Sequence, residues 1–95
     1  MARLVKKYIR IMLKLKIVSP EKVLFDGEVS MVKVPGVLGE FEILDNHAPI
    51  VSALQKGNVQ YETEEGRTVI PIVGGFAEVL KNNVSLCIER EIAAV

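Results

Sequence analysis

The residues best suited to chemistry gather in one short stretch, residues 39–50, which reads GEFEILDNHAPI and contains the single histidine of the chain. Asp45 lies two residues before His47, so its carboxylate could orient the imidazole as a general base. Such a base needs a nucleophile, and neither the serines nor the cysteine stands in a recognisable nucleophile motif. The structural alternative is that Asp45 and Asn46 form a turn and that His47 packs beside Pro49.

Glu40 and Glu42 form a second candidate, because alternate residues of a strand point to the same face. Paired carboxylates can bind a metal, but hard cations need further oxygen ligands from converging segments, and the chain has no Asp-rich loop. The glycine pairs lack the lysine and the helix of a phosphate-binding loop. The sequence therefore predicts no cofactor and no metal. A small ligand-binding or enzymatic β-barrel that uses Asp45, His47, Glu40 and Glu42 stays open as the alternative function.

Short strands must position these residues. Apolar and polar residues alternate from Leu13 onward, and turn pairs such as Asp26-Gly27 and Pro35-Gly36 interrupt the pattern. The expected strands cover residues 13–17, 23–25, 28–34, 39–44, 50–54, 58–62, 68–73, 76–80 and 84–88. No segment among them has helical periodicity. The sequence therefore predicts an all-β fold, a two-sheet β-sandwich or flattened barrel of about eight to ten short antiparallel strands.

Several local details follow from this pattern. Residues 63–67 should form a hairpin turn with Gly66 at positive φ, and residues 81–83 a second one in which asparagine takes the positive φ. Pro71 cannot donate a ladder hydrogen bond, so its strand should lie at an edge. Residues 28–34 carry apolar side chains at both parities, which favours burial from both sides. Because this chain is too short to cover both sides itself, we expect a partner to cover one of them.

Length and charge set the domain plan. The 95 residues suffice for one domain. Formal net charge is zero, but residues 1–16 carry six basic residues and no acid, which leaves residues 17–95 with six basic and twelve acidic residues. We expect a basic N-terminal extension over residues 1–12, a β-sandwich domain over 13–89 and a short tail over 90–95.

The composition also bears on partners. An acidic body argues against nucleic acid, which requires a basic surface. No apolar run approaches ~18 residues, so no membrane span is expected. Residues 1–12 form a basic amphipathic segment that suits weak contact with a membrane surface, unless residues 1–11 precede a natural start at Met12. Cys87 is the one cysteine, which excludes an internal disulfide and indicates a small apolar residue.

Three segments, IVSPEKVLFDGEV, VPGVLGEFEILDNHAPIVSALQKGNV and IPIVGGFAEVLKNNVSL, resemble the N-terminal domain of the ATP synthase epsilon subunit, called delta in mitochondria. The resemblance spans residues 13–88. It implies a two-sheet β-sandwich without chemistry of its own, in the rotating central stalk of an F-type ATP synthase. Such a subunit binds the gamma subunit and rests on the polar loops of the c-ring, so that ion-driven rotation is coupled to ATP synthesis. In bacteria it lies at the cytoplasmic face of the inner membrane.

The resemblance also assigns residues. The expected c-ring contact comprises Val37, Leu38, Gly39, Glu40, Phe41 and Glu42, and the expected gamma contact comprises Ser19, His47 and Ser52. Many relatives have glycine where this chain has Glu42, and many have Pro-Gly where it has Asp45-Asn46. Typical bacterial members continue beyond Val95 into a helical hairpin that inhibits ATP hydrolysis, so we expect this chain to lack that arm.

Overall fold

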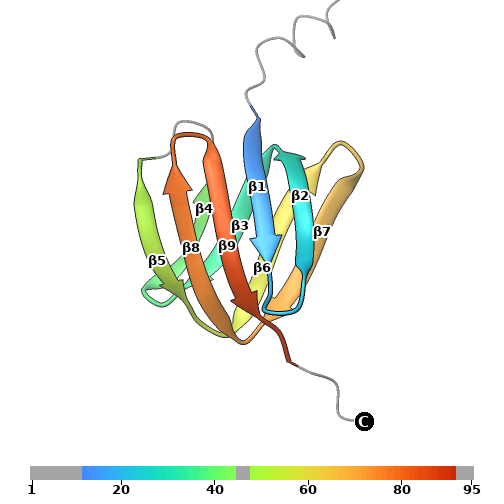
Figure 1. The fold of residues 1–95 in the computed structure, drawn as a ribbon. Coiled ribbons are helices and arrows are strands. Elements are labelled where there is room, and N and C mark those ends of the chain that lie inside the picture. The colour runs from blue at the N-terminus through green and yellow to red at the C-terminus, as the bar shows by residue number, and fades with distance from the viewer. Residues whose placement is uncertain (1–11, 45–47, 92–95) are drawn as a thin grey trace, which may run out of the picture.

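A computed structural model of the chain describes residues 12–44 and 48–91, and these residues form nine strands and no helix. The strands are β1 (Leu13–Val18), β2 (Val23–Val29), β3 (Met31–Gly36), β4 (Gly39–Ile43), β5 (Ile50–Leu54), β6 (Gly57–Thr63), β7 (Gly66–Ile72), β8 (Gly74–Leu80) and β9 (Asn83–Glu89). The predicted all-β class is confirmed, and Figure 1 shows the arrangement.

The strands form one curled sheet in the order β2-β1-β9-β8-β5-β3-β6-β7, with β4 paired to β3. The sheet folds over between β5 and β3, which share a single register pair, Gly36 with Leu54. Two layers result: a front layer of β5, β8, β9, β1 and β2, and a back layer of β4, β3, β6 and β7 (Figure 1). One pairing departs from the antiparallel prediction, because β9 enters beside β1 and runs parallel to it.

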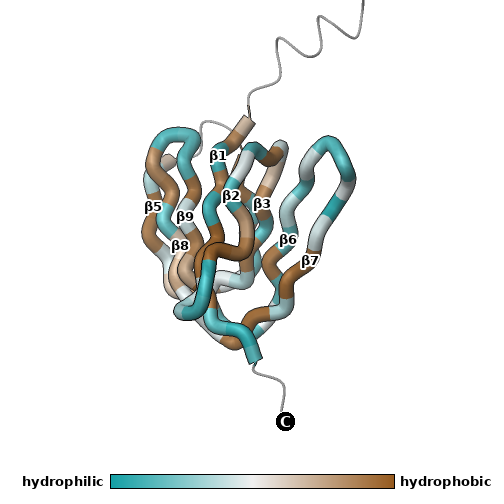
Figure 2. Tube along the Cα trace, turned by 45° about the vertical axis from the view of Figure 1, so that its right-hand side comes forward, coloured by the Kyte–Doolittle hydropathy of each residue, from teal (hydrophilic) through white to brown (hydrophobic). Residues whose placement is uncertain are grey.

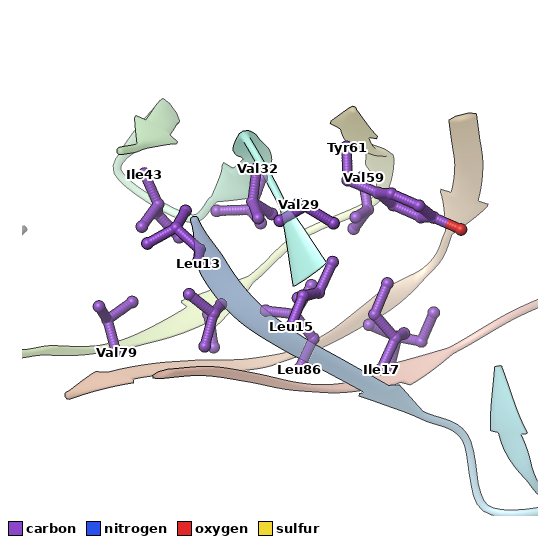
Figure 3. Close-up of a cluster of buried hydrophobic side chains, with 14 of the residues drawn as sticks. Leu13, Leu15, Ile17, Val29, Val32, Ile43, Val59, Tyr61, Val79 and Leu86 are labelled. Carbon is purple, nitrogen blue, oxygen red and sulfur yellow. The ribbon is translucent and has the colours of Figure 1, made fainter. Parts of the chain in front are cut away.

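The core lies between the two layers, and in the part of the chain that the structure describes it contains no buried polar or charged side chain. Strand β1 shows how the sequence builds it: Leu13, Leu15 and Ile17 are at most 1% exposed, and the lysines between them face water. Figure 3 shows these side chains meeting those of Leu86 and Val59 from other strands. Each fully buried aliphatic side chain contributes roughly 1.5–3 kcal/mol, so this alternation is the main source of stability.

The segment 28–34 is not the single strand that the sequence predicted. The chain bends at Ser30, whose N–H donates to the carbonyl oxygen of Glu62 at 2.9 Å, and the bend separates β2 from β3. Val29 and Val32, on opposite sides of the bend, both enter the same core with 0% exposure. Apolar residues at both odd and even positions of this segment therefore do not require that a partner bury its second face.

The predicted turns are partly correct. Asp26 and Gly27 do not form a turn but lie inside β2, opposite β1. The hairpin through Gly66 is confirmed, with φ +124° at the glycine. The hairpin between β8 and β9 is also confirmed, but Lys81 takes the positive φ of 57° instead of an asparagine. Pro71 lies in β7, an edge strand, as its missing N–H requires.

Candidate protein-docking surfaces

An apolar row crosses the outer side of the front layer, away from the core. Phe76 pairs with Ala53 on β5 and with Cys87 on β9, and Cys87 pairs with Val18 on β1. Paired residues of neighbouring strands share a face, and Phe76 is 61% exposed. We call Ala53, Phe76, Cys87 and Val18 the apolar band. Sequence analysis missed this band, because its four members come from four strands whose pairing the sequence does not reveal.

The apolar band borders an open groove of about 380 Å³ near the lower end of the layer as drawn in Figure 1. Gly75 permits the close approach of strands at this point: its φ is +151°, and a Cβ there would lie 2.2 Å from the carbonyl oxygen of Cys87. Ser19 lies at the groove in the turn after β1, where its hydroxyl donates to the Lys22 carbonyl at 3.2 Å. Cys87 is exposed and points away from the core, on the face opposite to that of Leu86 and Ile88.

The turn between β3 and β4 forms a second exposed surface. Leu38 is 101% exposed and Val37 is 50% exposed. Two backbone hydrogen bonds tie this hairpin to β5 and the residue after it: the Val37 N–H donates to the Ala53 carbonyl at 3.0 Å, and the Gln55 N–H donates to the Pro35 carbonyl at 2.9 Å. We call residues 37–39 the docking tip, because a firmly held backbone presents a leucine wholly to water.

The docking tip requires glycine where the strands meet. A Cβ on Gly36 would lie 2.8 Å from the carbonyl oxygen of Gly39 and 2.9 Å from Cε1 of Phe41. Gly39 itself has φ +134°, which L side chains rarely adopt. The ring of Phe41 therefore packs directly on the hairpin backbone and supports the tip from the core side.

Residues 12–94 match the family described as the β-sandwich domain of the ATP synthase delta/epsilon chain. The chain belongs to this family. The ATP synthase epsilon chain of Caulobacter vibrioides is 39% identical over 82 residues, which are 86% of this chain and 95% of that relative. The epsilon chain of Leptospira interrogans, serovar copenhageni, is 43% identical over 74 residues, which are 78% of this chain but 58% of the relative. The chain thus spans less than two thirds of the Leptospira relative.

Solved structures share the delta/epsilon fold. A chain of the Euglena gracilis mitochondrial ATP synthase aligns with a TM-score of 0.78 at 23% identity, covering 85% of this chain and 52% of that chain. A chain of the Tetrahymena thermophila mitochondrial ATP synthase, from a structure of its central stalk and c-ring, aligns with a TM-score of 0.69 at 15% identity, covering 84% of this chain and 65% of that chain. At these identities the likeness establishes the fold.

The six residues expected from the epsilon-subunit resemblance to contact a c-ring fall in three places. Val37, Leu38 and Gly39 form the docking tip. Glu40 and Glu42 point outward from the back layer, and Glu40 Oε1 lies 4.0 Å from Lys33 Nζ. Phe41 points between the layers and packs against the core. The period of two along β4 causes this division, and it could have been read from the sequence.

The residues expected to contact gamma are not brought together. Ser52 shares a face with the buried Ala77, and its hydroxyl donates to the carbonyl of Ala53 at 3.0 Å. The strand of Ser52 and that of Ser19 are separated by β8 and β9, a distance of about 14 Å at ordinary strand spacing. His47 and Asp45 lie outside the described residues. Ser52 therefore faces the interior from β5, whereas Ser19 and the apolar band lie on the outer side of the layer.

Of the four residues of the alternative, chemical site, the structure describes only Glu40 and Glu42. One pocket lies on the outer face of the front layer, a second lies beside β2 and the β6–β7 hairpin, and a third surrounds residues 56–58. Glu40 and Glu42 line none of these three pockets. Among residues 12–44 and 48–91 no three His, Cys, Asp or Glu side chains could together hold a metal ion. No helix within the same residues is long and apolar enough to cross a membrane.

Proposed function

We propose that this chain is a non-catalytic central-stalk subunit of an F-type ATP synthase. It links the gamma subunit to the c-ring, so that ion-driven rotation is coupled to ATP synthesis. In this role it lies at the cytoplasmic face of a bacterial inner membrane. Family membership supports this proposal, and the observation that carries it is the presence of two separate exposed apolar surfaces, the apolar band and the docking tip, on one domain.

The apolar band is the proposed binding surface for the gamma subunit. An exposed aromatic residue at the centre of an apolar strip is a typical hot spot of a protein interface. Ser19, beside the groove that the apolar band borders, supplies a polar rim contact. Ser52 and His47 are assigned to the same interface by the family resemblance alone. Burial of Phe76 and its neighbours removes apolar area from water, which favours association by about 25 cal/mol per Å² before the costs of association.

The docking tip is the proposed contact with the polar loops of the c-ring. Leu38 inserts between the loops, and its backbone needs little ordering because it is already held by β5. Glu40 and Glu42 lie beside it on the outer face of the back layer. Carboxylates at the rim of an interface set orientation and association rate more than affinity, so we assign them the recognition of basic residues on the ring.

Capture experiments test the two contacts separately. The immobilised chain should retain its cognate gamma subunit at micromolar concentration, and absence of a complex would contradict the proposal. The Leu38→Asp variant should lose the c-ring contact in a reconstituted rotor and keep gamma binding unchanged. The Glu40→Lys variant should weaken the ring contact to a smaller extent. If either variant reduced gamma binding as strongly as ring binding, the assignment of two separate surfaces would be wrong.

A further inference from the structure

A different groove, of about 450 Å³, lies where the two layers separate between β2 and the β6–β7 hairpin. The rings of Phe25 and Tyr61 meet inside it, with centroids 4.4 Å apart and planes tilted by 42°. Glu28, Glu64 and Glu65 stand around these rings. The hairpin tip is strongly hydrophilic in Figure 2. The groove therefore combines an aromatic floor with an acidic rim.

The charge of this rim is not balanced within the part of the chain that the structure describes. Glu28, Glu64 and Glu65 form no ion pair there. The nearest hairpin cation, Arg67, is held by Glu62, with Nη2 to Oε2 at 2.8 Å. Basic side chains with long apolar stems suit such a site, because the stems lie on aromatic rings and the charged heads reach carboxylates.

The chain itself supplies a segment with this chemistry. Met12 lines the groove, and the residues before it read MARLVKKYIRI. Residues 1–11 contain four basic residues, no acidic residue, and apolar residues between the charges. We propose that residues 1–11 fold back into this groove, where their basic side chains pair with Glu28, Glu64 and Glu65 and their apolar side chains cover the partly exposed ring of Phe25.

Tethering favours this occupant over others. Eleven residues reach up to about 36 Å when extended, and the attachment point at Met12 is already in the groove wall. A short flexible tether gives an effective concentration on the order of millimolar, which a free peptide or a second copy reaches only in concentrated solution. This docking does not depend on whether the chain serves in a rotor.

A tryptophan reporter tests the docking in the full chain, which contains no other tryptophan. The Tyr8→Trp chain should show emission shifted to the blue of a peptide of residues 1–11 with the same substitution. Adding Glu64→Lys and Glu65→Lys should abolish the shift, as should high salt. The matched control, Glu21→Lys with Glu78→Lys, changes net charge equally at exposed sites away from the groove and should keep the shift.

A charge swap between the segment and the groove shows whether loss of the blue shift comes from lost charge pairing or from a folding defect. Lys6→Glu and Lys7→Glu, combined with the two groove reversals, should restore the blue shift that the groove reversals alone remove. The proposal is overturned if the reporter emits like the free peptide, or if groove reversal leaves its emission unchanged. It is equally overturned if the shift depends on protein concentration, which indicates a second copy, or appears only with vesicles containing anionic lipid, which indicates a membrane surface.

Discussion

The two outer faces of this sandwich differ in how complete they are in water. The back layer presents ion pairs, Lys33 with Glu40 and Arg67 with Glu62. The lower part of the front layer instead presents the apolar band, with Phe76 61% exposed. In both layers, the outward residues alternate along each strand with residues that face the same core. The difference therefore does not arise from folding requirements, and we expect the apolar band to be the part of these two faces that gains most from being covered by a partner.

This contrast has an energetic reading. Charged pairs on the back layer gain little from being covered, because desolvation offsets their attraction. Apolar side chains on the front layer gain whenever water is excluded from them. A partner should therefore bind the front layer through the apolar band, and the back layer should contribute mainly orientation through its charges.

The largest expected effect concerns one glycine in each layer. Gly75→Ala should lower the free energy of unfolding by about 4 kcal/mol or more, because the new Cβ would collide with the Cys87 carbonyl at a strained φ. Gly66→Ala, at φ +124° with nothing within 4 Å, should cost about 1–2 kcal/mol. Urea denaturation of both variants measures this, and equal losses would contradict the close approach of β8 to β9.

The next effect separates the apolar band from the core. Leu86→Ala should lower the free energy of unfolding by about 2–5 kcal/mol, because it leaves a cavity between the layers. Phe76→Ser should change it by less than about 0.5 kcal/mol, because its side chain is already largely in water. Thermal and urea unfolding of the isolated chain provide both values. A large loss in Phe76→Ser would mean that the band is part of the core.

The smallest effect concerns the charged pairs of the back layer. Arg67→Ala should cost at most about 1 kcal/mol, since the pair with Glu62 is short but partly exposed. Lys33→Ala should have a smaller effect, because its distance to Glu40 is 4.0 Å. A double-mutant cycle on each pair isolates the coupling energy. Coupling above about 2 kcal/mol in either pair would refute the view that this face is merely solvated.

Sequence reasoning succeeded where one strand carries the whole signal. The alternation of Leu13, Leu15 and Ile17 predicts β1 and its buried face without further information. It failed at residues 28–34, because the bend at Ser30 depends on a hydrogen bond to Glu62, more than thirty positions away. Backbone partners so distant in sequence leave no local trace. The turn predicted at Asp26-Gly27 was wrong for the same reason. These residue types favour a turn, but pairing with β1 holds the two residues in an extended conformation.

The candidate site divides in the same way. The docking tip could be foreseen from the family motif, and the alternation along β4 would have assigned Phe41 to the core and the glutamates to the outside. The apolar band could not, because Phe76, Cys87 and Val18 become neighbours only through the strand order, including the parallel pair of β1 and β9. Asp45 and His47 lie outside the described residues, and their role stays a prediction.

The most direct measurement compares one exposed apolar residue from each face. Phe76→Glu and Val69→Glu introduce the same charge at residues that are 61% and 49% exposed, and each variant is titrated with the gamma subunit. We expect Phe76→Glu to weaken binding at least tenfold, about 1.4 kcal/mol, and Val69→Glu to leave the Kd unchanged. Equal losses, or a loss confined to Val69→Glu, would show that the front layer is not the surface that the partner covers.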